Sequence, residues 1–145
     1  AFKPETDDMR EAPATVVIDL LLEAGAEVCA YDPVAMPESQ RRMAGRPIRY
    51  ARTMYEAAEG ADAVALITEW KEFRMPDWPQ LHAAMRGDAI IDGRNIFDKP
   101  EVAAAGFRYF GIGKCPTKTA REKRAVSLQD RIFTTSESPS RRSRR

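Results

Sequence analysis

Apolar residues near the start of the chain recur at the spacing of one helix face. Positions 17, 20, 21 and 24 follow an i, i+3, i+4, i+7 pattern. The pattern predicts a helix between Pro13 and Gly25. Proline suits a first helical turn, where its missing N–H costs nothing, and glycine suits the left-handed position just past a helix end.

The rest of the apolar pattern alternates short strands with short helices. We expect strands at 27–31, 48–50, 63–68, 89–92 and 107–110. We expect helices at 38–44, 53–59, 78–85 and 100–105. Strands that alternate with helices over short connections indicate a parallel sheet with helices on both faces. The runs AVALIT and AIID are almost continuously apolar, which is typical of strands buried on both faces. The predicted fold is therefore α/β, a Rossmann-like three-layer sandwich.

The first strand of such a fold is not complete in this pattern. Only Ala1-Phe2-Lys3-Pro4 and a polar stretch precede the first helix, where a doubly wound domain has its first strand. We therefore expect the first strand to be truncated, with AFK as its stub and its beginning outside this chain.

Length and composition fit one globular domain without metal or membrane chemistry. The chain has 145 residues, 43% apolar and 31% charged. It has no apolar run of the roughly 20 residues that cross a bilayer, and its start lacks a secretory signal, so we expect a cytoplasmic protein. Cys29, Cys115 and His82 are too few for a disulfide framework or a four-ligand zinc site. We expect no metal.

The charge is unevenly distributed along the chain. Residues 1–113 carry 13 basic and 19 acidic side chains, whereas residues 114–145 carry 10 basic and 3 acidic ones. The second stretch also loses apolar periodicity and ends in SPSRRSRR. It cannot bury enough surface to offset its ordering entropy, so we predict a domain at 1–113 and a basic, disordered tail at 114–145. The tail lacks interleaved aromatic residues, which argues against nucleic-acid binding.

Candidate binding residues follow the predicted strands. Ligands of open α/β sheets bind beyond the carboxyl ends of the strands, and polar clusters lie there at 3–10, 31–33, 68–74 and 92–95. Lys3 and Arg94 are suited to hold a phosphate or diphosphate. The alternative is that these charges pair with neighbouring carboxylates on a solvated surface.

Other candidates favour structural roles. The chain has no GxGxxG, so Asp32, although placed like a ribose-binding acid, is better interpreted as part of an Asp-Pro turn. Cys29 lies within an apolar strand and Cys115 has no histidine nearby, so neither is predicted to be a nucleophile. The single histidine, His82, is expected to be a surface or packing residue.

The aromatic residues of the middle of the chain have several possible roles. Trp70, Phe73 and Trp78 fit a pocket lining, a subunit contact or core packing, and the sequence leaves the three open.

Five motifs, in order along residues 1–113, resemble the C-terminal domain of the UDP-glucose/GDP-mannose dehydrogenase family, most closely its UDP-glucose 6-dehydrogenases. They are AFKPETDDMREAP, EAGAEVCAYDPVA, ALITEWKEF, IIDGRNIFD and GFRYFGIG. The resemblance implies an NAD-dependent oxidation of UDP-glucose to UDP-glucuronate in polysaccharide biosynthesis. It also implies that the catalytic cysteine and the glycine-rich NAD site lie in other domains, so no catalytic residue is expected here.

The same resemblance implies particular site residues. Phe2 and Lys3 would contact the UDP-sugar, Arg94 would reach the same ligand, and Arg10 would approach the NAD pyrophosphate. Three carboxylates are expected to orient these cations and cap backbone N–H groups: Asp7, Asp8 and Asp92.

The implied partners are UDP-glucose or a related nucleotide sugar and further copies of the chain, since members of this family assemble as dimers or larger oligomers. Two alternatives remain open at this point. One is the equivalent domain of a GDP-mannose or UDP-N-acetylmannosamine dehydrogenase. The other is a stand-alone nucleotide-binding or interaction module.

Overall fold

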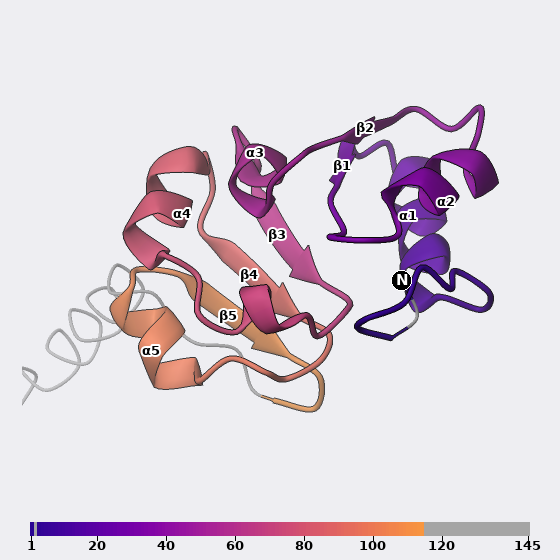
Figure 1. The fold of residues 1–145 in the computed structure, drawn as a ribbon. Helices are drawn as coiled ribbons and strands as arrows, with labels where there is room; N and C mark the ends of the chain where they lie inside the picture. Colours follow the sequence, from indigo (N-terminus) through magenta and orange to yellow (C-terminus); the bar gives the residue numbers. More distant parts are fainter. Residues whose placement is uncertain (2, 115–145) are drawn as a thin grey trace, which may run out of the picture.

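Short helices and parallel strands alternate along the whole of the described chain (Figure 1). The computed structural model describes residue 1 and residues 3–114. The helices are α1 (Pro13–Glu23), α2 (Met36–Arg42), α3 (Met54–Ala58), α4 (Trp78–Ala84) and α5 (Lys99–Ala104). The strands are β1 (Val28–Ala30), β2 (Ile48–Tyr50), β3 (Ala63–Leu66), β4 (Ala89–Asp92) and β5 (Arg108–Gly111). A 3₁₀ turn, η1 (Lys71–Phe73), was not predicted.

The predicted helices and strands are confirmed with small shifts at their ends. The residues at the helix ends are of types that favour a helix start or stop. Pro13 opens α1, and Gly25 follows the helix with a left-handed φ of 82°. The Thr53 hydroxyl accepts from the Glu56 N–H at the start of α3. The predicted tail lies outside the described residues except for Lys114.

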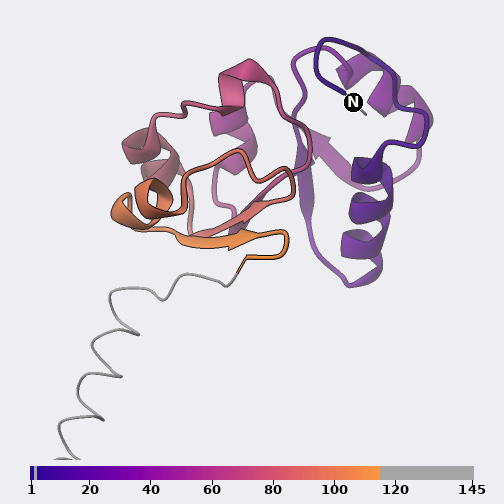
Figure 2. The same ribbon diagram turned by 90° about the horizontal axis from the view of Figure 1, so that it is seen from below.

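The strands form two parallel sheets rather than one continuous sheet. β1 pairs with β2, and the second sheet has the order β3-β4-β5. Figures 1 and 2 show the first sheet, with α1 and α2, standing beside the second. Among the described residues, no strand pairs with both β1 and β3 and so joins the two sheets.

The start of the chain lies between the ends of β1 and β3. The Ala1 amino group donates to Asp32 Oδ2 at 2.7 Å, just after β1, and the Ala1 carbonyl accepts from Thr68 Oγ1 at 2.8 Å, just after β3. The first residue therefore connects the loop after β1 to the loop after β3. The truncated first strand itself stays a prediction.

The main core lies between β3-β4-β5 and the helices α3, α4 and α5. Ile90 and Tyr109 project from the sheet into this core and are 1% and 0% exposed. The helices contribute Ala58, Trp78, Leu81 and Val102. Full burial of a large apolar side chain contributes roughly 1.5–3 kcal/mol, so this cluster fixes how α3–α5 pack on the sheet.

The prediction that the two apolar strands are buried on both faces is wrong. Ala63 and Ala65 of β3 are exposed, and Ile91 of β4 is 41% exposed. The helices α3, α4 and α5 pack on the opposite face, and no described element buries these side chains. An apolar strand sequence is compatible with burial of both faces, but burial also requires another element that packs on each face.

Candidate functional site

Residues 68–70, Thr-Glu-Trp, tie together the loops at the carboxyl ends of the strands, and we call them the bridging tripeptide. Thr68 holds the segment that contains Lys3, through its hydrogen bond to the Ala1 carbonyl. The Trp70 indole N–H donates to Asp32 Oδ2 at 3.1 Å, which fixes the loop after β1. Both bonds are buried, so they hold two loops at this edge against the end of β3.

The middle residue of the bridging tripeptide reaches the loop after β4. Arg94 Nη2 donates to Glu69 Oε1 at 3.0 Å, and each of the two side chains is 34% exposed. The sequence left open whether Arg94 pairs with a carboxylate or serves a ligand. The structure shows the ion pair, and part of the Arg94 side chain stays exposed to solvent.

Asp92 fixes the loop that carries Arg94 through hydrogen bonds to the backbone of that loop. It is fully buried and accepts from the Arg94 N–H at 3.0 Å, the Phe97 N–H at 2.9 Å and the Tyr109 hydroxyl at 3.1 Å. The predicted capping role of Asp92 is confirmed. The loop that carries Arg94 therefore has little freedom to move.

The two cations predicted to hold a diphosphate come from loops at the same edge of the fold. Lys3 lies two residues after Ala1, which Thr68 holds, and Arg94 pairs with the next residue of the bridging tripeptide. The Lys3 side chain is exposed. Phe2 lies outside the described residues, so its predicted contact has no structural counterpart.

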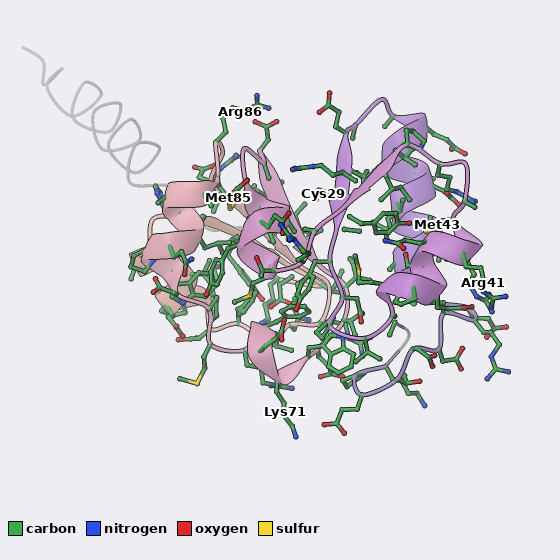
Figure 3. All side chains as sticks on the ribbon, turned by 45° about the horizontal axis from the view of Figure 1, so that its top comes forward. Cys29, Arg41, Met43, Lys71, Met85 and Arg86 are labelled. Carbon is green, nitrogen blue, oxygen red and sulfur yellow. The ribbon has the colours of Figure 1, made fainter. Side chains whose placement is uncertain are left out.

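A cavity of about 590 Å³ opens beside the bridging tripeptide. Residues 4–5, Pro33, residues 69–72 and Arg74 line it. Its charges are mixed. Lys71 Nζ lies 3.2 Å from Glu5 Oε1 and projects from one end of the molecule (Figure 3). The segment after Lys3 and the loop after β3 therefore both line one cavity.

Arg74 is the site residue that the sequence did not single out. Its Nη2 donates to Glu69 Oε2 at 3.3 Å, so it shares one carboxylate with Arg94. The available signal was its place in the polar cluster at 68–74 directly after an apolar strand. Nothing in the sequence pattern shows that the two arginines meet at Glu69.

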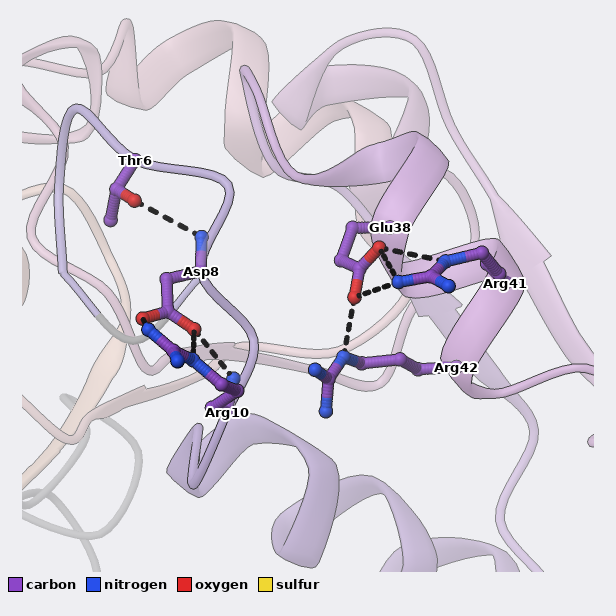
Figure 4. Close-up of polar contacts among 6 residues, drawn as sticks. All are labelled: Thr6, Asp8, Arg10, Glu38, Arg41 and Arg42. Carbon is purple, nitrogen blue, oxygen red and sulfur yellow. Dashed lines mark hydrogen bonds and ion pairs between the residues drawn. The ribbon is translucent and has the colours of Figure 1, made fainter.

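Arg10 is held by its own neighbour. Its Nε and Nη2 donate to the two oxygens of Asp8 at 3.0 and 2.9 Å, which confirms that Asp8 orients this cation (Figure 4). The guanidinium lowers the pKa of Asp8 to about 2, and the backbone N–H of Arg10 adds to this effect. The charge of Arg42 in α2 lowers the pKa of Asp8 further. The predicted contact of Arg10 with NAD stays a prediction.

Replacing Arg10 with glutamine is expected to raise the pKa of Asp8 from about 2 toward the ordinary value of 3.8. The side-chain bond from Arg10 is the largest cause of the lowering, while the backbone bond from residue 10 remains. The stabilisation by this pair is fully present at pH values above the ordinary aspartate pKa of 3.8. It is lost as the pH falls through about 2. NMR titration of the Asp8 carboxyl measures the shift. Arg41→Gln is the control, because Arg41 pairs with Glu38 and not with Asp8. If the pKa of Asp8 stays near 2 in the Arg10→Gln variant, Arg10 is not the cause of the lowering.

Asp32 forms a turn, and groups of this chain occupy both oxygens of its carboxylate. Its oxygens accept from the backbone N–H groups of Val34 and Ala35, from the Trp70 indole and from the Ala1 amino group. The predicted Asp-Pro turn is confirmed.

Two further candidates, Cys29 and His82, have structural roles. Burial raises the pKa of the Cys29 thiol, which keeps it protonated and makes it a poor nucleophile. The His82 ring packs on Phe107 with centroids 5.1 Å apart. Cys115 lies outside the described residues.

The aromatic residues of the middle of the chain are buried. Trp70 and Phe73 form a small core with Leu66, and Trp78 belongs to the main core. Trp70 also lines the cavity.

The described residues supply no complete cofactor or metal site. In residues 1 and 3–114, no group of three or more histidine, cysteine, aspartate or glutamate side chains is arranged to hold a metal ion. The same range has no glycine-rich GxGxxG loop, so these residues do not fit a complete NAD site. None of the helices in this range is long and apolar enough to cross a membrane.

Comparisons with known proteins point to one family. The family model "UDP-glucose/GDP-mannose dehydrogenase family, UDP binding domain" matches residues 1–99. A UDP-glucose 6-dehydrogenase of Rhizobium meliloti is 48% identical over 113 residues, covering 78% of this chain and 25% of that protein. One from Pseudomonas aeruginosa is 43% identical over 125 residues, covering 79% and 26%.

A solved structure agrees with these matches. The UDP-glucose dehydrogenase of the hyperthermophilic archaeon Pyrobaculum islandicum has 30% identity and a TM-score of 0.64, with 79% of this chain and 24% of that chain covered. The likeness confirms the predicted Rossmann-like fold class. The chain spans about a quarter of the length of these relatives.

Proposed function

Because this chain belongs to the UDP-glucose/GDP-mannose dehydrogenase family, as its UDP-binding domain, we propose that it holds the nucleotide sugar of an NAD-dependent UDP-glucose 6-dehydrogenase. The single observation that carries the proposal is the bridging tripeptide. It joins the segment of Lys3 to the ion pair of Arg94 at the edge where open α/β sheets bind ligands.

Lys3 and Arg94 suit a diphosphate for different reasons. An ammonium group is a compact charge on a flexible stem, whereas a guanidinium presents a planar fork that binds two oxygens of one phosphate. Asp92 fixes the backbone of Arg94, which limits the conformational entropy lost when the fork binds. Phe2 is proposed to contact the sugar nucleotide beside Lys3.

The proposed reaction converts UDP-glucose, two NAD⁺ and water into UDP-glucuronate and two NADH, with release of protons. The UDP-glucose 6-dehydrogenases that this chain resembles are about four times as long as the part it covers. We propose that the reacting nucleophile and most of the NAD site lie in the parts of such an enzyme that this chain does not cover. Supporting this division, the Cys29 thiol is disfavoured as a nucleophile by its raised pKa. When bound, NAD would supply the hydride acceptor, and Arg10 would add a cation for its pyrophosphate. Residues 1–114 alone are expected to lack dehydrogenase activity.

The setting of the enzyme is part of the same proposal. We expect it to work in the cytoplasm and to associate into dimers or larger homo-oligomers.

Ligand titrations of the complete natural polypeptide that contains this chain test the proposal. UDP is expected to bind at least about tenfold more tightly than uridine, because hydrogen bonds to charged groups contribute about 1.5–3 kcal/mol and uridine has no phosphates. Calorimetry measures both affinities. Equal affinities for UDP and uridine would mean that Lys3 and Arg94 do not hold a diphosphate.

Substrate turnover separates the alternatives. UDP-glucose is expected to drive NADH formation, followed by absorbance, while GDP-mannose and UDP-N-acetylmannosamine are not. NADH formation with either of those two sugars alone would assign the chain to the corresponding branch of the family. UDP binding without NADH formation from any of them would favour a binding module.

A further inference from the structure

One carboxylate connects two arginines from different loops at the carboxyl edge of the strands. Glu69 Oε1 accepts from Arg94 Nη2 at 3.0 Å, and Glu69 Oε2 accepts from Arg74 Nη2 at 3.3 Å. Arg94 follows β4, whereas Arg74 follows η1. The two oxygens of a single anion therefore hold the two guanidinium groups near each other.

This arrangement is the one that an oxyanion ligand with two or more oxygens would make. Guanidinium groups bind carboxylates and phosphates through the same N–H donors, and they prefer two oxygens of one group. The side chains of Glu69, Arg74 and Arg94 are 34%, 50% and 34% exposed, so solvent and small anions reach them. Arg74 and Glu69 also line the cavity beside the segment of Lys3.

The charges favour exchange of the carboxylate for a diphosphate. With Glu69 in place, the three side chains carry one net positive charge. A nucleoside diphosphate sugar carries a negative charge on each phosphate, which matches the two arginines once Glu69 has moved away. Exposed ion pairs contribute little to stability, so displacing Glu69 costs little free energy.

We propose that Arg74 and Arg94 form a two-arginine clamp for the diphosphate of the nucleotide sugar, and that Glu69 occupies this clamp until the ligand displaces it. The inference rests on the proposed function and adds two residues to it. Arg74 becomes a binding residue, and Glu69 becomes a competitor that sets the affinity.

Replacing Glu69 with glutamine tests the competition. In the complete natural polypeptide, Glu69→Gln is expected to bind UDP roughly twofold to fivefold more tightly, the fold-change that corresponds to the free energy of an exposed ion pair. The double variant Glu69→Gln/Arg74→Gln is expected to lose this gain. Uridine affinity is expected to be the same in all variants. Calorimetry with UDP and uridine gives these numbers.

Asp62→Asn is the matched control for the change in net charge. Asp62 pairs with Arg86 and is 72% exposed. It directly precedes β3, at the opposite edge from Glu69. Arg86 and Lys71 project from opposite ends of the molecule in Figure 3. Asp62→Asn is expected to leave UDP affinity unchanged, and an equal gain in this variant would assign the effect to overall charge and overturn the competition.

The outcomes separate this inference from the proposed function. Weaker or unchanged UDP binding by a folded Glu69→Gln variant overturns the competition. If Glu69→Gln does not fold, Arg74→Gln alone tests the clamp: several-fold weaker UDP binding supports it, and unchanged binding overturns it. If Arg94→Ala weakens UDP binding while the Glu69 and Arg74 variants change nothing, only the clamp fails. If the unaltered polypeptide does not bind UDP, the proposed function fails as well.

Discussion

Replacing Asp92 with alanine is expected to lower the free energy of unfolding by about 3 kcal/mol. The carboxylate is fully buried and accepts from two backbone N–H groups, of Arg94 and Phe97, and from the Tyr109 hydroxyl. A buried donor that loses its partner costs about 1–3 kcal/mol, and the truncation leaves several such donors behind. Urea unfolding of the 145-residue chain, followed by circular dichroism, measures the change.

Two further variants show whether hydrogen bonding causes this loss. Tyr109→Phe removes the hydroxyl that donates to Asp92 and is expected to cost about 1 kcal/mol. Asp92→Asn keeps one acceptor oxygen and is expected to fall between the wild type and Asp92→Ala. A loss below about 1 kcal/mol in Asp92→Ala would show that water satisfies the donors and that Asp92 does not hold the loop.

The local elements of the fold are predictable because their signals are local. The start and end of α1 follow from Pro13 and Gly25, and the end of β4 follows from an apolar run that stops at Asp92. The pairing of strands into two sheets is not local, since it depends on what lies between β1 and β3. For the same reason the exposure of Ile91 could not be predicted: its side chain is apolar, but its cover would have to come from elsewhere.

The candidate site divides in a similar way. Lys3 and Arg94 are recognisable because each follows a strand end within a motif that resembles a known family. The capping role of Asp92 is recognisable because carboxylates at strand ends commonly bond to loop N–H groups. The meeting of Arg74 and Arg94 at Glu69 is different, since the two arginines are 20 positions apart in the sequence and only the folded chain brings them to one carboxylate.

Replacing Arg94 with alanine in the complete natural polypeptide is expected to weaken UDP binding by about 1.5–3 kcal/mol, roughly tenfold to more than a hundredfold. The guanidinium provides charge-assisted hydrogen bonds to the diphosphate, and methyl groups cannot replace them. The ion pair between Arg94 and Glu69 is lost at the same time, so Arg74 alone then balances the charge of the Glu69 carboxylate. Calorimetric titration with UDP measures the loss.

The controls for this variant distinguish the fork of Arg94 from its charge and from its effect on folding. Arg94→Lys keeps a positive charge without the planar fork, so its UDP affinity should fall between that of the wild type and that of Arg94→Ala. Arg86→Ala removes an exposed arginine that pairs with Asp62 before β3, and its UDP affinity should stay at the wild-type value. Because Asp92 bonds to the backbone of residue 94, the loop keeps its anchor in each Arg94 variant. Unchanged UDP affinity in a folded Arg94→Ala variant would remove Arg94 from the site, and the diphosphate would then have to be held by other cations.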